Sequence, residues 1–222
     1  YCSAMTRPGT LAIGLTGGIG TGKSRVGELL RTLGAAVECS DEIVRDIQAP
    51  GGAALAQIAA LFGEEYVLPS GELDRTRLGE LVFRDPDARR KLGNLIHPLV
   101  YRELSRRLEA HRQREVPVVV LDIPLLLEGR ESGRGSGARL PFDLVLLVYA
   151  DQETQLQRIM ARDGLSHDDA LARIRSQLPI EEKRALADVV IDNAGKVEAT
   201  SQRVRECYEQ WVSADEPTAA PA

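Results

Sequence analysis

The chain has 222 residues, of which 43% are hydrophobic and 27% are charged, a composition that excludes a largely disordered protein. Its 28 basic and 33 acidic side chains give a net charge of −5, so the overall field repels a nucleic-acid backbone. The three cysteines are an odd number without metal-ligand spacing, which favours the reducing cytoplasm over a secreted disulfide framework. No apolar run approaches the roughly 20 residues that cross a bilayer. We therefore expect a cytoplasmic protein with no nucleic-acid or membrane partner, and no obligate protein partner is evident.

Five short apolar runs, rich in branched side chains, alternate with helical patterns along the chain. They cover residues 11–16, 35–39, 117–123, 143–149 and 188–192. Such runs are typical of strands that are buried on both faces of a parallel sheet. The sequence therefore predicts an α/β fold with a doubly wound, five-stranded parallel sheet.

Two stretches between these runs are expected to form helical additions to the sheet. In residues 42–115, apolar side chains keep helical spacing, Asp85 before Pro86 indicates a helix start, and His97 before Pro98 indicates that a helix restarts there. We expect this stretch to form a helical insertion on the core. In residues 151–185, Asp151 can cap one helix and Ser166 another. These helices could form a lid.

The remaining segments, 10–41, 116–150 and 186–212, are assigned to the nucleotide-binding core. Within the core, residues 129–139 are rich in Gly, Ser and Arg and predict a flexible loop. Residues 213–222 predict a disordered tail.

Residues 17–24 read GGIGTGKS and match the phosphate-binding P-loop pattern between a predicted strand and a predicted helix. Glycines allow the backbone N–H groups to turn toward phosphate oxygens, and the helix N-terminus favours negative charge. Lys23 is one of only four lysines in the chain and can reach the β- and γ-phosphates, while Ser24 can ligate magnesium. The residues expected to bind ATP here are Gly17, Gly18, Ile19, Gly20, Thr21, Gly22, Lys23, Ser24 and Arg25.

A P-loop alone leaves kinases, GTPases and motor ATPases open. Guanine-specific switches carry an N-K-x-D type segment, for which DNAGK at 192–196 is a poor substitute, and no ring-interface features of a motor are identifiable. These observations favour a kinase.

Two aspartates follow predicted strands at the sheet edge where such folds bind ligands. Asp41 follows the second strand and could serve as a general base toward a substrate hydroxyl; the alternative is that it only caps the next helix. Asp122 ends the third strand, as a magnesium-binding Walker B carboxylate does; the alternative is an ordinary polar strand end.

Arg158 and Arg162 lie four residues apart on a predicted helix, so both could close on a phosphate. The alternative is a solvated helix face. His97 has no partner at metal-ligand spacing and by itself is typical of a structural, hydrogen-bonded histidine.

Several segments, taken in order, resemble those of the dephospho-CoA kinase family: LTGGIGTGKS, SDEIVRDI followed by PGG, LIHPLV, LDIPLLLE, QLQRIMARD and VVIDNAG. The resemblance runs from about residue 11 to 211. It implies phosphorylation of the ribose 3′-hydroxyl of dephospho-CoA with ATP and magnesium, on a core, substrate domain and lid similar to those of nucleoside monophosphate kinases.

The resemblance also implies roles for individual residues. Asp41 matches the presumed catalytic base, Arg158 and Arg162 match lid arginines that embrace ATP phosphates together with Lys23, and Asn193 matches a segment near the adenine or the lid hinge. On the same basis we expect magnesium at Ser24 and Asp122, and dephospho-CoA at Asp41, Arg45, His97, Pro124 and Leu125.

The chain departs from the family at three places. Cys39 and Ser40 precede Asp41 where the family often has DAD, Arg25 stands where Thr is common, and the glycine-rich loop at 129–139 is longer than usual. Two alternatives remain open at this stage. One is a P-loop kinase for another small hydroxyl or nucleoside monophosphate substrate, and the other is a nucleotide-binding module without transfer activity.

Overall fold

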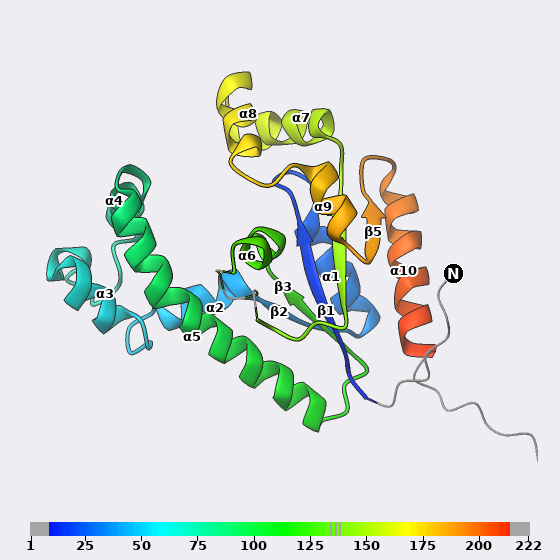
Figure 1. The fold of residues 1–222 in the computed structure, drawn as a ribbon, viewed down its shortest axis with the longest axis horizontal. Coiled ribbons are helices and arrows are strands. Elements are labelled where there is room, and N and C mark those ends of the chain that lie inside the picture. Colours follow the sequence, from blue (N-terminus) through cyan, green and yellow to red (C-terminus); the bar gives the residue numbers. More distant parts are fainter. Residues whose placement is uncertain (1–8, 134, 136, 138, 214–222) are drawn as a thin grey trace, which may run out of the picture.

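Five parallel strands form the centre of the computed structural model, which describes residues 9–133, 135, 137 and 139–213 (Figure 1). The strands lie in the order β2-β3-β1-β4-β5. This confirms the predicted doubly wound α/β fold, and each of the five apolar runs matches one strand to within one residue at either end. The strands are β1 (Leu11–Gly17), β2 (Ala36–Cys39), β3 (Val118–Asp122), β4 (Leu144–Tyr149) and β5 (Val189–Asp192).

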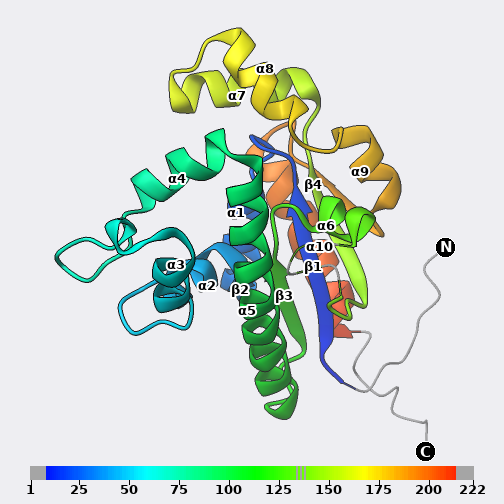
Figure 2. The ribbon, with the colours of Figure 1, turned by 60° about the vertical axis from the view of Figure 1, so that its left-hand side comes forward.

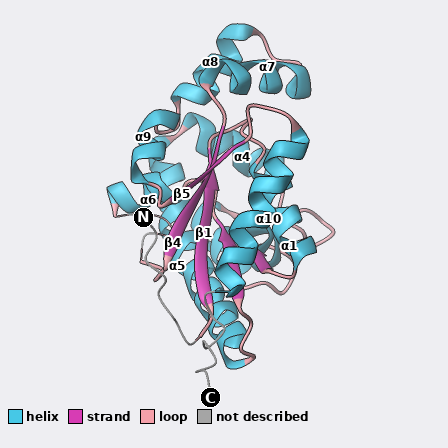
Figure 3. Cartoon of the chain, turned by 90° about the vertical axis from the view of Figure 1, so that its right-hand side faces the viewer, coloured by secondary structure: helices cyan, strands magenta, loops and turns pink. Residues whose placement is uncertain are grey.

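Helices cover both faces of the sheet, as the continuous apolar character of the strands requires. On one face, Ile13 and Leu15 of β1 pack with α1 (Lys23–Leu33) and α10 (Val197–Ser213), which Figure 3 shows side by side. On the other face, Ala12 belongs to a cluster with α5 (Pro86–Gln113) and α6 (Leu126–Ser132). Alternate residues of β1 therefore enter opposite cores.

A helical arm extends from the β2 edge of the sheet. It consists of α2 (Ser40–Ile47), α3 (Leu55–Phe62), the 3₁₀ turn η1 (Glu64–Tyr66), α4 (Arg75–Arg84) and the first turns of α5. Figure 2 shows α3 and α4 standing away from the sheet beside α5. The predicted start of α5 is confirmed, because Pro86 is its first residue and Asp85 Oδ1 accepts from the Asp87 and Ala88 backbone N–H groups at 2.8 and 3.1 Å.

The prediction that a helix restarts at His97 and Pro98 is wrong, because α5 runs through both residues without interruption. Proline removes one backbone hydrogen bond inside a helix. The side chains of Ile96, Leu99 and Val100 around it are buried in the core, and their packing outweighs that loss. Of the described helices none, including the 28-residue α5, is long and apolar enough to cross a membrane.

Beyond the sheet edge where β1 ends lie α7 (Gln152–Asp163) and α8 (His167–Arg175) (Figure 1). They have a small core of their own, made by Leu156, Ile159 and Ala170. The predicted caps are confirmed, since Asp151 accepts from the Thr154 N–H at 2.8 Å and Ser166 from the Asp169 N–H at 3.2 Å. The following helix, α9 (Ile180–Leu186), instead packs against β4 of the core.

Two loop predictions need correction. Residues 129–132 belong to α6, whose first turn buries Leu126 and Leu127 and so stabilises a helix despite the Gly- and Ser-rich sequence. The rest of the predicted loop includes 134, 136 and 138, which lie outside the described residues. Helix α10 continues to Ser213, so the predicted tail is helical at its first residue, and 214–222 lie outside the described part of the chain.

We expect Leu104→Ala to lower the free energy of unfolding by about 2–5 kcal/mol, because Leu104 on α5 is fully buried in the core beside the sheet. Phe83→Ala is the matched control, since that side chain is 85% exposed and its loss should change stability by less than about 0.5 kcal/mol. Urea unfolding followed by circular dichroism measures both. Equal stability losses in the two variants would contradict the assignment of the core.

Candidate active site

The P-loop, residues 17–24, connects the end of β1 to the start of α1. Gly20 and Gly22 have φ angles of 78° and 86°, in the left-handed region that favours glycine, and Gly22 is the N-cap of α1. The Thr21 hydroxyl donates to the Gly18 carbonyl at 2.8 Å and closes the loop on itself. This backbone forms an anion-binding helix N-terminus of the kind that holds phosphate groups.

Asn193, just after β5, supports the P-loop from behind. Its buried side-chain amide donates to the Thr21 carbonyl at 2.7 Å, while its oxygen accepts from the Thr200 hydroxyl at 3.0 Å. A Cβ atom on Gly22 would overlap the Asn193 amide nitrogen. The glycine is therefore required both for its φ angle and for this close approach.

One cavity of about 760 Å³ lies in front of the loop and brings together residues from distant segments of the chain. Of the residues predicted for ATP or catalysis, Thr21, Arg25 and Asn193 do not line it. Its walls are formed by Gly17, Gly18, Ile19, Gly20, Gly22, Lys23, Ser24, Asp41, Pro124, Arg158, Ala161, Arg162 and Gln177.

Lys23 and Asp122 form an ion pair beside this cavity, with Lys23 Nζ donating to Asp122 Oδ1, and both side chains are largely buried. Strand register explains the position of Asp122, which pairs with Leu15 of β1 on one side and Cys39 of β2 on the other. Burial raises the pKa of Asp122, the Lys23 charge opposes this rise, and Asp41 adds to it. The carboxylates of Asp41 and Asp122 thus concentrate negative charge next to the P-loop lysine.

The donor set here fits magnesium. The Ser24 hydroxyl lines the cavity and the Asp122 carboxylate lies beside it, bonded to Lys23 of the cavity wall. Magnesium is held by oxygen ligands, usually one or two from the protein with the rest from phosphates and water. Ser24 and Asp122 match such a site in chemistry and in number.

Asp41 is placed to meet a substrate in the cavity. It lies in the first turn of α2, and because Cys39 is the N-cap of that helix, the alternative that Asp41 is its cap is wrong. Its carboxylate is exposed and lines the cavity. Burial raises the pKa of the neighbouring Cys39 thiol, which keeps the thiol neutral.

The two arginines of α7 reach the cavity but make different contacts. Arg158 donates to the carbonyl of Asn193 at 2.7 Å and to that of Gly20 at 3.4 Å, so it lies against the P-loop and not on a purely solvated face. Arg162 pairs with Asp163 at 2.6 Å, with most of its side chain exposed. Because this ion pair is exposed to solvent, another anion can replace Asp163 as the partner of Arg162.

The residues predicted for the acceptor substrate are spread out. Pro124 lines the main cavity, and its carbonyl accepts from the Thr16 hydroxyl at 3.0 Å. Leu125 is 51% exposed and lies outside the cavity wall, as does Arg45, whose carbonyl accepts from the Arg75 side chain at 3.3 Å.

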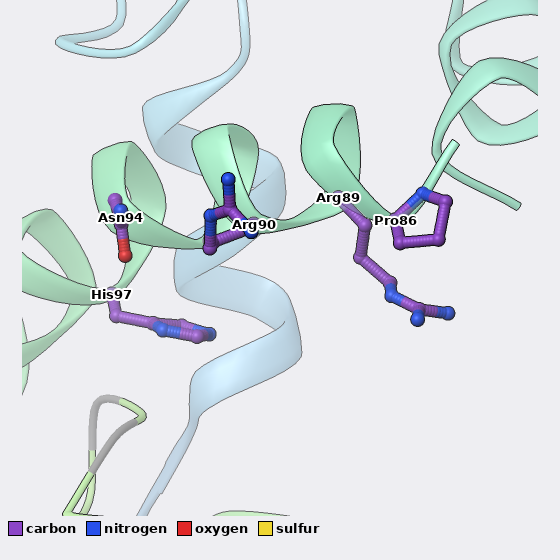
Figure 4. A pocket seen from close by; sticks show the side chains of 6 residues that line it. Pro86, Arg89, Arg90, Asn94 and His97 are labelled. Carbon is purple, nitrogen blue, oxygen red and sulfur yellow. The ribbon is translucent and has the colours of Figure 1, made fainter.

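His97 lies on α5 between two smaller cavities. One, of about 340 Å³, is lined by Arg89, Arg90 and Asn94 (Figure 4), and the other, of about 370 Å³, by Tyr101 and Arg139 among others. Burial lowers the pKa of His97, so its ring is neutral near pH 7.

Sequence reasoning missed Gln177 and Ala161 on the cavity wall. Gln177 Oε1 accepts from the Ile19 backbone N–H at 2.9 Å and so fixes one side of the P-loop. Gln177 lies in an irregular segment between α8 and α9, where no periodicity or motif marks it.

A family model described as dephospho-CoA kinase matches residues 11–199. The chain belongs to the dephospho-CoA kinase family. Among curated relatives, the dephospho-CoA kinase of Carboxydothermus hydrogenoformans is 41% identical over 90% of this chain and 93% of its own length. That of Syntrophotalea carbinolica is 45% identical over 87% of this chain and 89% of its own length.

Solved structures agree with this assignment. The protein TT1252 from Thermus thermophilus is similar with a TM-score of 0.73 and 37% identity, over 91% of this chain and 98% of its own. The dephospho-CoA kinase from Campylobacter jejuni has a TM-score of 0.68 and 27% identity, over 93% of this chain and all of its own. Dephospho-CoA kinase activity, the final step of coenzyme A biosynthesis, follows from family membership, and a kinase of this kind uses ATP as its phosphoryl donor.

We expect Gly22→Ala to abolish measurable ATP binding, because the added methyl group meets the Asn193 amide and the φ of 86° is unfavourable for alanine. Gly195→Ala is the control, since nothing lies within 4 Å of the added methyl group there. Fluorescence titration with a labelled ATP analogue measures both variants. Unchanged affinity for the ATP analogue in Gly22→Ala would contradict the close packing of Gly22 against Asn193.

Proposed function

We propose that the chain transfers the γ-phosphoryl group of ATP to the 3′-hydroxyl of the ribose in dephospho-CoA. One observation supports this above the others: a single continuous cavity is lined by the P-loop, by Asp41 and by both arginines of α7. Phosphoryl transfer needs little covalent chemistry from a protein, but it needs donor, acceptor and positive charge held in one place.

In this proposal the donor side of the cavity is the P-loop. Its backbone N–H groups hold the ATP phosphates, and Lys23 leaves its ion pair with Asp122 to contact the β- and γ-phosphates. Ser24 and Asp122 would hold magnesium, which neutralises part of the phosphate charge when bound. The roles of Thr21 and Asn193 are then to shape the loop from behind, and Arg25 lies outside the cavity wall.

Asp41 acts as the general base on the acceptor. It takes the proton of the 3′-hydroxyl as the hydroxyl oxygen forms a bond to the γ-phosphorus, and the bond from that phosphorus to the bridging oxygen of ADP breaks. The products are coenzyme A and ADP, with the proton on Asp41. Its exposed position at the cavity wall allows the proton to pass on to solvent afterwards.

Residues 151–185 would act as a lid, and Arg158 and Arg162 would bring positive charge to the transferring group. Arg158 already contacts the P-loop at Gly20. Arg162 would exchange Asp163 for phosphate oxygens as the lid closes and excludes water. The core segments 10–41, 116–150 and 186–212 would hold ATP, and 42–115 would hold the acceptor.

The acceptor arm would lie along α5. His97 stands between two cavities, and Arg89 and Arg90 on the same helix supply cationic groups suited to the diphosphate of dephospho-CoA. The neutral ring of His97 would donate a hydrogen bond and carry no charge. Pro124, with Arg45 and Leu125 nearer the rim, would contact the acceptor between this arm and Asp41. A cytoplasmic location is also proposed, in keeping with the free thiols of Cys39 and Cys207.

We expect Asp41→Asn to lower turnover with dephospho-CoA by roughly 10²- to 10⁴-fold, because the amide cannot accept the hydroxyl proton. The KM for ATP should change little, since the P-loop is untouched. A coupled assay of ADP release measures both constants. Asp46→Asn on the same helix is the control, because its side chain is 65% exposed and it is not on the cavity wall. Near wild-type turnover in Asp41→Asn would show that another group is the base.

We expect dephospho-CoA to accelerate ADP release far more than AMP, CMP or shikimate, because in the proposed site Asp41 would meet the ribose hydroxyl and the α5 cavities would hold the long anionic arm. The same coupled assay, run with each acceptor in turn, decides between the alternatives. Acceleration by AMP, CMP or shikimate instead would indicate another small-molecule kinase. Tight ATP binding without acceleration by any acceptor would indicate a non-catalytic nucleotide-binding module.

A further inference from the structure

Lys183 is a lysine whose side chain is fully buried, with 0% of its surface exposed. Among the described residues, Asp122 is the one other buried acidic or basic side chain, and its pairing with Lys23 in the active site explains it. Burying a charge is costly unless the charge is paired and hydrogen-bonded. The burial of Lys183, on α9 and outside the cavity wall, therefore needs its own explanation.

The ammonium group of Lys183 joins two separate parts of the chain. It lies 2.6 Å from Glu128 Oε1 on α6 and donates to the carbonyl of Gly17 at 3.4 Å. Gly17 is the last residue of β1, the first residue of the P-loop and part of the cavity wall. A lysine on α9, which follows α7 and α8 in the sequence, thus contacts the first residue of the P-loop.

Further hydrogen bonds fix the segment that leads into α9. The Leu178 N–H donates to Glu128 Oε1 at 3.2 Å, and Gln177 Oε1 accepts from the Ile19 N–H at 2.9 Å. The chain returning from α8 is therefore attached to α6 by two contacts, both at Glu128, and to the P-loop at two points, Gly17 and Ile19. Helix α6 itself follows Pro124, which forms another wall of the same cavity.

Stability alone does not account for this ion pair. Glu128 Oε2 is buried and has no hydrogen-bond partner among the described residues, so the pair is incompletely satisfied. Replacing a buried ion pair by apolar side chains of similar volume is often neutral or stabilising. Because the pair carries this desolvation cost and contacts the P-loop backbone at Gly17, its role is better explained as positioning that backbone.

We infer that Lys183 and Glu128 form a positioning pair for phosphoryl transfer. The pair holds three walls of the cavity in register: the P-loop through the Gly17 carbonyl, the Pro124 wall through α6, and the Gln177 wall through the start of α9. It keeps the P-loop aligned while α7 and α8 move over the nucleotide. Neither side chain touches ATP or the acceptor, so both act through the backbone that they fix.

The test compares Lys183→Met, Glu128→Gln and the double variant Lys183→Met/Glu128→Leu with the wild type. Each single variant leaves one member of the pair without its charged partner, in a site with little or no access to solvent, so both its melting temperature and its kcat should fall. The double variant is apolar at both positions and should regain the wild-type melting temperature. Its kcat should nevertheless remain about 10- to 100-fold below wild type, with the KM for dephospho-CoA near the wild-type value.

Hydrogen exchange supplies a readout that does not depend on turnover. In the double variant, the backbone amides of residues 18–24 should exchange faster than in the wild type, because the loop has lost its Gly17 attachment. Arg184→Met on α9 and Glu131→Gln on α6 are matched controls, since both side chains are exposed and belong to the same helices. Neither control should change kcat or exchange.

If the double variant regains the melting temperature, kcat and slow exchange together, the pair is only structural and the inference is wrong. The inference rests on the phosphoryl transfer proposed above, but the two can fail separately. Failure of the wild type to phosphorylate dephospho-CoA would refute the proposed reaction. Unchanged exchange in residues 18–24 of the double variant would refute the positioning pair.

Discussion

The hydrogen bond from the Asn193 amide to the Thr21 carbonyl fixes the P-loop on which every other part of the site depends. A loop with two glycines in the left-handed region is entropically expensive to order. Asn193 is 172 residues from Thr21 along the chain and is itself buried. Contacts made by the completed sheet therefore offset the entropy lost when the loop is ordered. The shape of the loop therefore depends on a contact that the chain makes just after β5.

The same dependence on distant segments recurs around the loop. Gln177 bonds the Ile19 N–H, Lys183 bonds the Gly17 carbonyl, and Arg158 bonds the Gly20 carbonyl. All three come from the second half of the chain, at or after α7. In the proposed reaction, a protein of net charge −5 would bind two highly anionic substrates through a few cations placed at the P-loop, where they act at short range.

The fold could be predicted from the sequence where the signal is local. Strand runs, the caps at Asp85, Asp151 and Ser166, and the P-loop pattern each depend on a few consecutive residues, and the structure agrees with them. The restart at Pro98 was a local inference too, but there burial of the neighbouring side chains overrides the proline. Tertiary packing of this kind leaves no mark within a short window.

The site shows the same division. Asp41 could be proposed because it directly follows a strand, and parallel strands bring their carboxyl ends to one edge. Gln177 could not, because it lies in an irregular segment whose approach to Ile19 depends on the path of the whole lid. The sequence marks Lys183 only weakly: like Lys23, it is one of four lysines in an arginine-rich chain.

The ion pairs beside the cavity would also divide the proposed lid, residues 151–185, into a moving part and a fixed part. The pair of Arg162 with Asp163 is exposed, so water can replace either partner and the pair is readily exchanged for phosphate contacts. The pair of Lys183 with Glu128 contains a fully buried ammonium group, and separating the pair would leave that positive charge without solvent or a carboxylate partner. Closure should therefore carry α7 and α8 over the cavity while α9 stays on the core. The boundary between the two parts then falls near Gln177, where the chain is already fastened to the P-loop.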